Sequence, residues 1–202
     1  MKQCVQGAVL AGGQSSRMGT NKAWLELNGR PVIDRVTNIM AEWADQITIV
    51  ADEREAFNSQ PYPVISDIHT GIGPMGGLHA ALSRMDEGVL ALSACDTPFI
   101  EKGVYQHLLQ ELNRLEASIV IPVHHNRYHP MSGLYSTRLL SHIEDAIEKH
   151  HYSLRQLWQR TDVHFVEAFP GISDQQLDAH FFNMNTPEDY RQACQMVKFL
   201  CQ

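Results

Sequence analysis

The residues that could do chemistry begin at a glycine pair, Gly12-Gly13, which ends the apolar run at 8–11. Adjacent glycines let a backbone approach a ligand closely, because no Cβ stands in the way. Backbone N–H groups in such a turn form a nest for phosphate oxygens, and the nearby cations Arg17 and Lys22 can offset the charge of an anion. The segment predicts a triphosphate cradle at the carboxyl end of a first strand.

Two better-known phosphate motifs do not fit this segment. A Walker loop needs a hydroxyl residue directly after its lysine to hold the metal, and Lys22 is followed by Ala23. A dinucleotide fingerprint needs glycines in the pattern G-x-G-x-x-G, which the residues at 12–16 do not supply. The cradle therefore belongs to a different class of phosphate site.

Two aspartates follow apolar runs further along the chain. Asp96 comes directly after the run at 89–94, and ligands of open α/β sheets gather at the carboxyl ends of strands. A carboxylate there suits Mg²⁺, which binds one or two carboxylates together with phosphate oxygens and water. Asp67 precedes a glycine-rich segment that contains Gly76 and Gly77 and that could close around a base. Either aspartate could instead be a turn former.

Polar residues in the second half are weaker candidates. Asn183 and Asn185 flank Met184, and strand alternation would place both amides on one face. A polar loop holds His129 and Arg127, which could contact an acceptor phosphate, together with two further histidines, His124 and His125. We expect no zinc site in that loop, because the ligand spacing is poor and no carboxylate lies nearby in sequence.

Composition limits the class of protein. The chain has 202 residues, 44% of them hydrophobic and 19% charged, and a net charge of −7 without a basic stripe, which argues against a nucleic-acid partner. No apolar run reaches the length of a membrane span and no secretory leader is visible, so we expect no membrane association. The cysteines lack C-x-x-C spacing, which favours a reduced, cytoplasmic protein over a zinc ribbon or disulfide framework: Cys4, Cys95, Cys194 and Cys201.

Short apolar segments alternate with helical patterns through the first 123 residues. We predict strands at 8–11, 47–51, 64–65, 89–94 and 118–123, and helices from about residue 32, at 77–85 and at 102–115. After residue 123 we predict strands at 131–136 and 163–169, helices at 137–149 and 153–160, and a last helix that Thr186 caps, with Pro187 in its first turn and Asp189 in the capping box.

This alternation predicts an α/β fold, with a mostly parallel central sheet between two helical layers. The length suits a single domain over 1–202, in which residues to about 123 form a nucleotide-binding half and residues from about 124 form an acceptor-binding half.

Five motifs in order give the chain a close resemblance to a known family. The first loop reads LAGG-x-S-x-RMG-x-x-K, and it is followed by GPMGGLHAAL at 73–82, CDTPFI at 95–100, YHPMSGLY at 128–135 and FFNMNTPEDY at 181–190. Together they cover nearly the whole chain. The chain resembles the MobA-like nucleotidyltransferases, and among them the molybdenum cofactor guanylyltransferases, which implies a Rossmann-like nucleotidyltransferase fold.

The resemblance implies a function and a set of site residues. It implies transfer of GMP from GTP to the phosphate of molybdopterin, which releases pyrophosphate, with Mg²⁺ or Mn²⁺ bound by Asp96. It places Lys22 and Arg17 on the phosphates, and Asn183 and Asn185 near the site. The nucleotide contacts that it implies are Leu10, Ala11, Gly12, Gly13, Lys22, Asp67, Gly76, Gly77 and Asp96.

Three alternatives stay open. The same chemistry could use CTP, although both glycine loops have the guanylyl form, or a sugar-phosphate acceptor. A nucleotide-binding module without catalysis would not need both Lys22 and Asp96.

One residue departs from the family pattern, because Val50 stands where relatives often carry an asparagine that touches the nucleotide. A transient contact with the preceding biosynthetic enzyme or with acceptor apoenzymes would suit a labile product.

Overall fold

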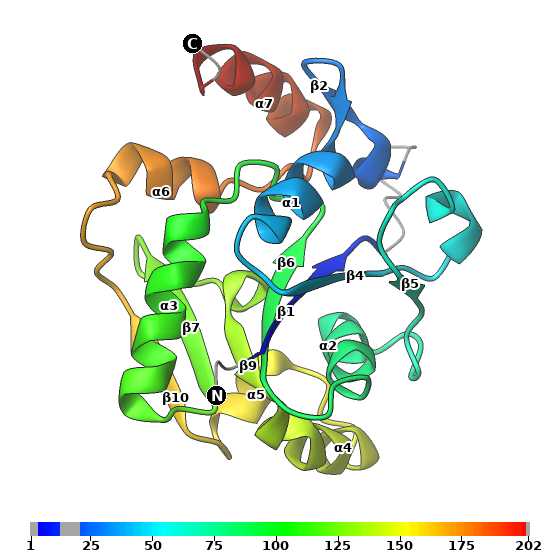
Figure 1. Cartoon of the computed structure of the whole chain (residues 1–202), viewed down its shortest axis with the longest axis vertical. Coiled ribbons are helices and arrows are strands. Elements are labelled where there is room, and N and C mark those ends of the chain that lie inside the picture. Colours follow the sequence, from blue (N-terminus) through cyan, green and yellow to red (C-terminus); the bar gives the residue numbers. More distant parts are fainter. Residues whose placement is uncertain (1–3, 13–20, 201–202) are drawn as a thin grey trace.

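A mixed β-sheet between helices forms the centre of the protein in the computed structural model, which describes residues 4–12 and 21–200 (Figure 1). The strands of this sheet in the described part of the chain are β1 (Val5–Leu10), β4 (Gln46–Val50), β5 (Val64–Ile65), β6 (Val89–Ala94), β7 (Ile119–His124), β8 (Arg127–Tyr128), β9 (Leu134–Ser136) and β10 (Val163–Val166). A separate small hairpin pairs β2 (Glu26–Leu27) with β3 (Arg30–Pro31).

The strand order is β10-β7-β9-β6-β1-β4-β5, with β8 paired to β7. The strands β1, β4, β5 and β6 are mutually parallel, whereas β9 is antiparallel to both of its neighbours. In this register Leu10, the last residue of β1, pairs with Val50 of β4 and Ala94 of β6. The carboxyl ends of the first-half strands therefore meet at one edge of the sheet.

Helices cover both faces of this sheet. They are α1 (Val32–Ala41), α2 (Pro74–Leu82), α3 (Lys102–Leu115), α4 (Leu140–Glu148), α5 (Leu154–Trp158), α6 (Asp174–His180) and α7 (Pro187–Leu200). One hydrophobic core holds residues of α1 and α3 and extends to α6 and α7, and a second core holds residues of α2, α4 and α5. Among the described residues, no helix is both long and apolar enough to span a bilayer.

The central strands β1, β4 and β6 are mostly apolar because both of their faces are buried. Ala8 of β1 faces the second core and Val9 faces the first, and in β6 Leu90 and Ala91 divide in the same way. Successive side chains of a strand point to opposite faces, so one apolar run supplies both layers. The predicted fold class, a mostly parallel sheet between helical layers, is confirmed.

Several predicted element bounds are corrected. The second helix begins at Pro74, three residues before the predicted start, because proline suits the first turn of a helix. Gly76 and Gly77 therefore lie inside α2 rather than in a loop. The predicted strand at 131–136 covers only β9, preceded by a 3₁₀ turn at Pro130–Ser132, and the strand predicted at 163–169 ends at Val166.

The start of the last helix forms as predicted. Thr186 Oγ1 accepts a hydrogen bond from the Asp189 backbone N–H at 3.1 Å, and the Asp189 carboxylate accepts from the Thr186 N–H at 2.8 Å. This reciprocal pair is a capping box with aspartate in place of the usual glutamate. Asp189 also accepts from the backbone N–H of Asn185, which fixes the residue before the helix.

Candidate active site

A cavity of about 510 Å³ lies at the carboxyl ends of β1, β4 and β6, where α/β folds commonly bind ligands. Main-chain hydrogen bonds continue past the strands into its floor, from the Ala11 N–H to the Val50 carbonyl and from the Cys95 N–H to the Leu10 carbonyl. Its described lining is Leu10, Ala11, Gly12, Asn21, Lys22, Val50, Ala51, Asp52, Asp67, Gly71, Gly73, Pro74, Gly77, Ala94, Cys95, Asp96, Met131 and Asn183.

Lys22 enters this cavity from a 3₁₀ turn, Lys22–Trp24, that Asn21 caps by accepting from the Ala23 N–H at 3.0 Å. Its ammonium group donates to the Asn185 side-chain oxygen at 2.8 Å and lies 3.7 Å from the Asp96 carboxylate. The lysine side chain is 15% exposed. A cation that is mostly withdrawn from water and directed into a cavity is well placed to bind an anionic ligand.

Asp96 follows β6 directly and faces the same cavity. Burial raises the pKa of its carboxyl group, and the nearby Lys22 ammonium opposes that rise. The Asp96 backbone carbonyl accepts a hydrogen bond from the Met184 N–H at 2.8 Å, which ties the strand end to the segment before α7. The side chain remains 28% exposed, so the carboxylate can reach a ligand.

Asp67 also lines the cavity and lies close to Gly76 in the first turn of α2. A Cβ at Gly76 would stand 2.5 Å from the Asp67 carboxylate and 2.8 Å from the His69 carbonyl, so a larger residue would displace the aspartate. Burial raises the pKa of Asp67, and the negative charge of Asp52 raises it further. The carboxylates of Asp52 and Asp67 both line the cavity and can accept hydrogen bonds from N–H or O–H groups of a bound molecule.

Gly73 sets the direction in which α2 leaves the loop. Its backbone has φ of 65° and ψ of −150°, a region that is essentially restricted to glycine. Gly73 and Pro74 both line the cavity, so the amino-terminal end of α2 faces it. Helix amino termini carry partial positive charge, and this end adds to the anion-binding character of the cavity.

Most of the predicted nucleotide contacts come together in this cavity. Gly76 does not line the cavity, but its lack of a Cβ leaves the space that the Asp67 carboxylate occupies. Gly13 and Arg17 lie outside the described residues. The two asparagines do not form a strand, yet Asn183 lines the cavity and Asn185 contacts Lys22, with Met184 buried between them.

Arg127 and His129 are not among the described lining residues. Arg127 is exposed in β8, and the His129 ring stacks on Phe181 with a centroid distance of 4.1 Å. Burial lowers the pKa of His129 to about 4, so the ring is neutral at pH 7 and carries no charge toward a phosphate.

Several lining residues were not among the predicted site residues, including Asn21, Met131 and Cys95. Asn21 precedes Lys22, and its capping role could have been inferred from its place before a short apolar segment. Met131 enters from the 3₁₀ turn after β8, and no local pattern indicated it. Burial raises the pKa of Cys95 to about 12, so the thiol stays protonated and does not act as a nucleophile at neutral pH.

Comparison with known proteins assigns the chain to a family. The sequence model of the MobA-like NTP transferase domain matches residues 7–165. The chain belongs to the MobA-like NTP transferase family. The family predicted from the five motifs is therefore confirmed, and the chain is a nucleotidyltransferase.

Relatives of this MobA-like chain match it over nearly its full length. A probable molybdenum cofactor guanylyltransferase of Halalkalibacterium halodurans is 31% identical over 191 residues, which are 91% of this chain and 94% of the relative. The crystal structure of molybdopterin-guanine dinucleotide biosynthesis protein A from Archaeoglobus fulgidus has a TM-score of 0.83 at 27% identity, and the match covers 96% of this chain and 99% of that one.

A more distant structural neighbour was crystallised with a metal. A Mycobacterium tuberculosis protein solved in complex with manganese has a TM-score of 0.66 at 16% identity, over 96% of this chain and 99% of its own. At that identity the likeness shows the shared fold alone.

Proposed function

We propose that this nucleotidyltransferase transfers GMP from GTP to the terminal phosphate of molybdopterin, with or without bound molybdenum. The observation that carries the proposal is the pairing of Lys22 and Asp96 at 3.7 Å inside a cavity at the strand ends. Relatives that match more than nine-tenths of the chain and are named molybdenum cofactor guanylyltransferases support the choice of substrates.

The reaction needs no protein nucleophile, because the acceptor phosphate already supplies an ionised oxygen. That oxygen attacks the α-phosphorus of GTP, and a new P–O bond forms. The bond from the α-phosphorus to the oxygen that bridges it to the β-phosphate breaks, and pyrophosphate leaves with the electron pair. Catalysis then depends on alignment and on stabilisation of the charge that develops.

Lys22 supplies positive charge to the α-phosphate and the leaving pyrophosphate. Asn185 holds the ammonium group on one side and Asp96 attracts it on the other, so the cation is oriented before substrate arrives. Arg17, which lies outside the described residues, is proposed to contact the same phosphates.

Asp96 fits the role of the protein ligand of Mg²⁺, with Mn²⁺ as the alternative. Its carboxylate lines the cavity and burial penalises its charge, which a bound cation would compensate. Mg²⁺ commonly takes a single carboxylate together with substrate phosphates and water, so one aspartate is sufficient. When bound there, the ion would neutralise charge on the transferring phosphoryl group.

We assign recognition of the guanine nucleotide to Asp67, with Gly77 in the lining beside it and with Gly76 leaving the space that the Asp67 carboxylate occupies. Val50 lines the cavity without a polar side-chain group, and Asp52, two residues later, lines it with a carboxylate. Val50 cannot make the polar contact that the resemblance implies for an asparagine at this position, so we propose that nucleotide binding depends more on Asp67.

The two halves of the chain divide this work. Nucleotide binding falls to residues up to about 123, which supply most of the lining. Acceptor binding falls to the residues that follow, which contribute Met131 and Asn183.

We further propose a cytoplasmic location and transient delivery of the product to acceptor apoenzymes. Cys4, Cys95 and Cys194 are free thiols in the structure, as a reducing compartment would leave them.

Calorimetric binding of GTP, CTP, ATP and UTP in the presence of Mg²⁺ tests the nucleotide assignment. We expect GTP to bind most tightly, and Asp67→Asn to weaken GTP while Asp86→Asn, an exposed control, does not. Preference for CTP would support the cytidylyl alternative instead. Tight GTP binding without any molybdopterin-dependent pyrophosphate release would support a non-catalytic binding module.

A further inference from the structure

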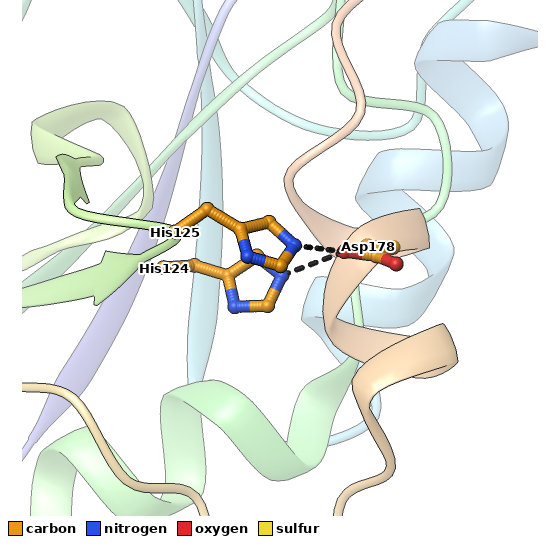
Figure 2. Close-up of side chains that lie close together, drawn as sticks. All are labelled: His124, His125 and Asp178. Carbon is orange, nitrogen blue, oxygen red and sulfur yellow. Dashed lines mark hydrogen bonds and ion pairs between the residues drawn. The ribbon is translucent and has the colours of Figure 1, made fainter.

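Two histidines and an aspartate converge on the surface away from the candidate active site. The Nε2 atoms of His124 and His125 lie 2.7 Å and 2.8 Å from the same oxygen, Oδ1 of Asp178 (Figure 2). His124 ends β7, His125 begins the turn to β8, and Asp178 lies on α6. The carboxylate that local sequence did not supply is brought in by the fold from more than fifty residues downstream.

The backbone around this cluster is held in an uncommon conformation. His125 and Asn126 both have positive φ, 48° and 57°, which makes the β7–β8 connection a two-residue turn of the left-handed type. Such turns favour Asn-Gly, and a histidine at the first position costs conformational energy. Figure 2 shows that this turn directs the His125 ring toward Asp178, beside the ring of His124.

We propose that His124, His125 and Asp178 form a binding site for a borderline divalent transition metal of the Zn²⁺ class. Two imidazole nitrogens and one carboxylate oxygen are a common ligand set for zinc, and three protein ligands leave a coordination position open. The proposal does not rest on the proposed function, because none of the three residues lines the cavity described above.

The geometry needs little adjustment to accept an ion. The three ligand atoms lie within 4.8 Å of one another. Tetrahedral zinc with bonds of about 2.0–2.1 Å places its ligand atoms roughly 3.3 Å apart, so Asp178 must withdraw by about half an ångström from each ring. Its side chain is 57% exposed and can move, whereas the His124 side chain is 11% exposed and packs against Phe181.

A metal at this site would join the β7–β8 hairpin to α6. The segment that follows α6 carries Met184, whose N–H donates to the Asp96 carbonyl, and Asn185, which accepts from Lys22. The ion would therefore fix the start of a segment whose far end supports the candidate active site. A zinc-bound protein should unfold at a higher temperature than the metal-free protein.

Binding of Co²⁺ and Zn²⁺ to the full-length, tag-free chain tests the site, with excess Mg²⁺ present to occupy Asp96. We expect one Zn²⁺ per chain, and visible absorption bands of low-symmetry Co²⁺ that Zn²⁺ abolishes. His125→Asn and Asp178→Asn should weaken binding at least about 10–100-fold, the loss that even outer-shell changes produce in metal sites. Asparagine tolerates positive φ, so His125→Asn preserves the turn.

Matched variants separate this site from others on the chain. His150→Asn alters another exposed histidine with positive φ, and Asp174→Asn alters another exposed aspartate of α6; both should bind Zn²⁺ like the wild type. Zn²⁺ should raise the unfolding temperature of the wild type but not of His125→Asn. The proposal is overturned if the wild type binds no Zn²⁺, if His125→Asn and Asp178→Asn bind it unchanged, or if Asp96→Asn abolishes binding.

Discussion

Lys22 and Asp96 each depend on residues far away in the sequence. The lysine ammonium is held by Asn185, which is 163 positions further along the chain, and the backbone of Asp96 is held by Met184. One short segment before α7 therefore positions both charged groups. At the scale of single residues, the candidate site is an opposite-charge pair in a cavity, with Lys22 placed to bind a substrate phosphate and Asp96 placed to bind a cation.

Replacement of Lys22 by alanine should remove charge stabilisation without unfolding the protein. We expect kcat/KM for nucleotidyl transfer to fall about 10²–10³-fold, the typical cost of removing one preorganised donor to a developing charge. Steady-state pyrophosphate release measures the effect. Lys102→Ala, which removes an exposed lysine paired with Glu42, is the control and should retain activity. Equal losses in the two variants would refute a special role for Lys22.

Asp96→Asn should fold normally and lose metal-dependent turnover by at least about 100-fold. Burial raises the pKa of Asp96 in the native protein, so its charged form destabilises the fold at neutral pH, and an uncharged amide should leave the unfolding temperature equal or higher. Mg²⁺ titration of activity and thermal unfolding measure both effects. Near wild-type turnover would exclude Asp96 as the metal ligand.

At the scale of elements, the path of the loop that enters α2 depends on the backbone conformation of Gly73. Alanine at Gly73 should destabilise the protein by about 1–3 kcal/mol, because φ of 65° with ψ of −150° strains any residue with a Cβ. It should also weaken GTP binding, since the amino terminus of α2 faces the cavity.

Gly171→Ala is the matched control for this variant. Gly171 also has positive φ, 83°, and open space around it, but it does not line the cavity. It should cost stability and leave GTP affinity unchanged. Chemical denaturation and calorimetry on both variants decide the matter, and unchanged GTP affinity in Gly73→Ala would contradict the role assigned to α2.

Sequence patterns predicted the elements that bury two faces and missed two short elements, although both carry local signals. The strand at 89–94 and the helix at 102–115 have the predicted bounds, because continuous apolar runs and helical periodicity are strong local signals. The β2–β3 hairpin was missed although Asn28-Gly29, both with positive φ, is its typical turn. Helix α6 was also missed, despite the capping box that Ser173 forms with Gln176.

The site was partly predictable for a physical reason. Residues at the carboxyl ends of parallel strands must meet, so Leu10 and Asp96 could be brought together from sequence alone. Spacing could not show that Asn185 would contact Lys22, or that Asp178 would reach His124, because these contacts depend on how α6 and α7 dock. The resemblance to a family indicated the first of these regions and not the second.

At the scale of the whole molecule, buried histidine links stability to pH. Burial lowers the pKa of His79 on α2, nearby His69 lowers it further, and Glu144 at 3.9 Å opposes them. Below pH 6.5 His79 binds a proton in the unfolded chain more readily than in the native protein. The free energy of unfolding therefore decreases as the pH falls.

His79→Gln removes this titration. Between pH 7 and 5 the free energy of unfolding of the wild type should fall more steeply than that of the variant, by at most about 1.4 kcal/mol per pH unit, the slope for one proton. Urea denaturation across this range gives both curves. Curves that stay parallel would contradict the assignment of the pH dependence to His79.

The most direct test of the account is product analysis after incubation of the purified chain with molybdopterin, Mg²⁺ and GTP. Mass spectrometry should show the guanine dinucleotide of molybdopterin together with an equal amount of pyrophosphate, and far less product when CTP replaces GTP. Formation of the cytosine dinucleotide in preference to the guanine form, or no dinucleotide with either nucleotide, would contradict the proposed guanylyl transfer.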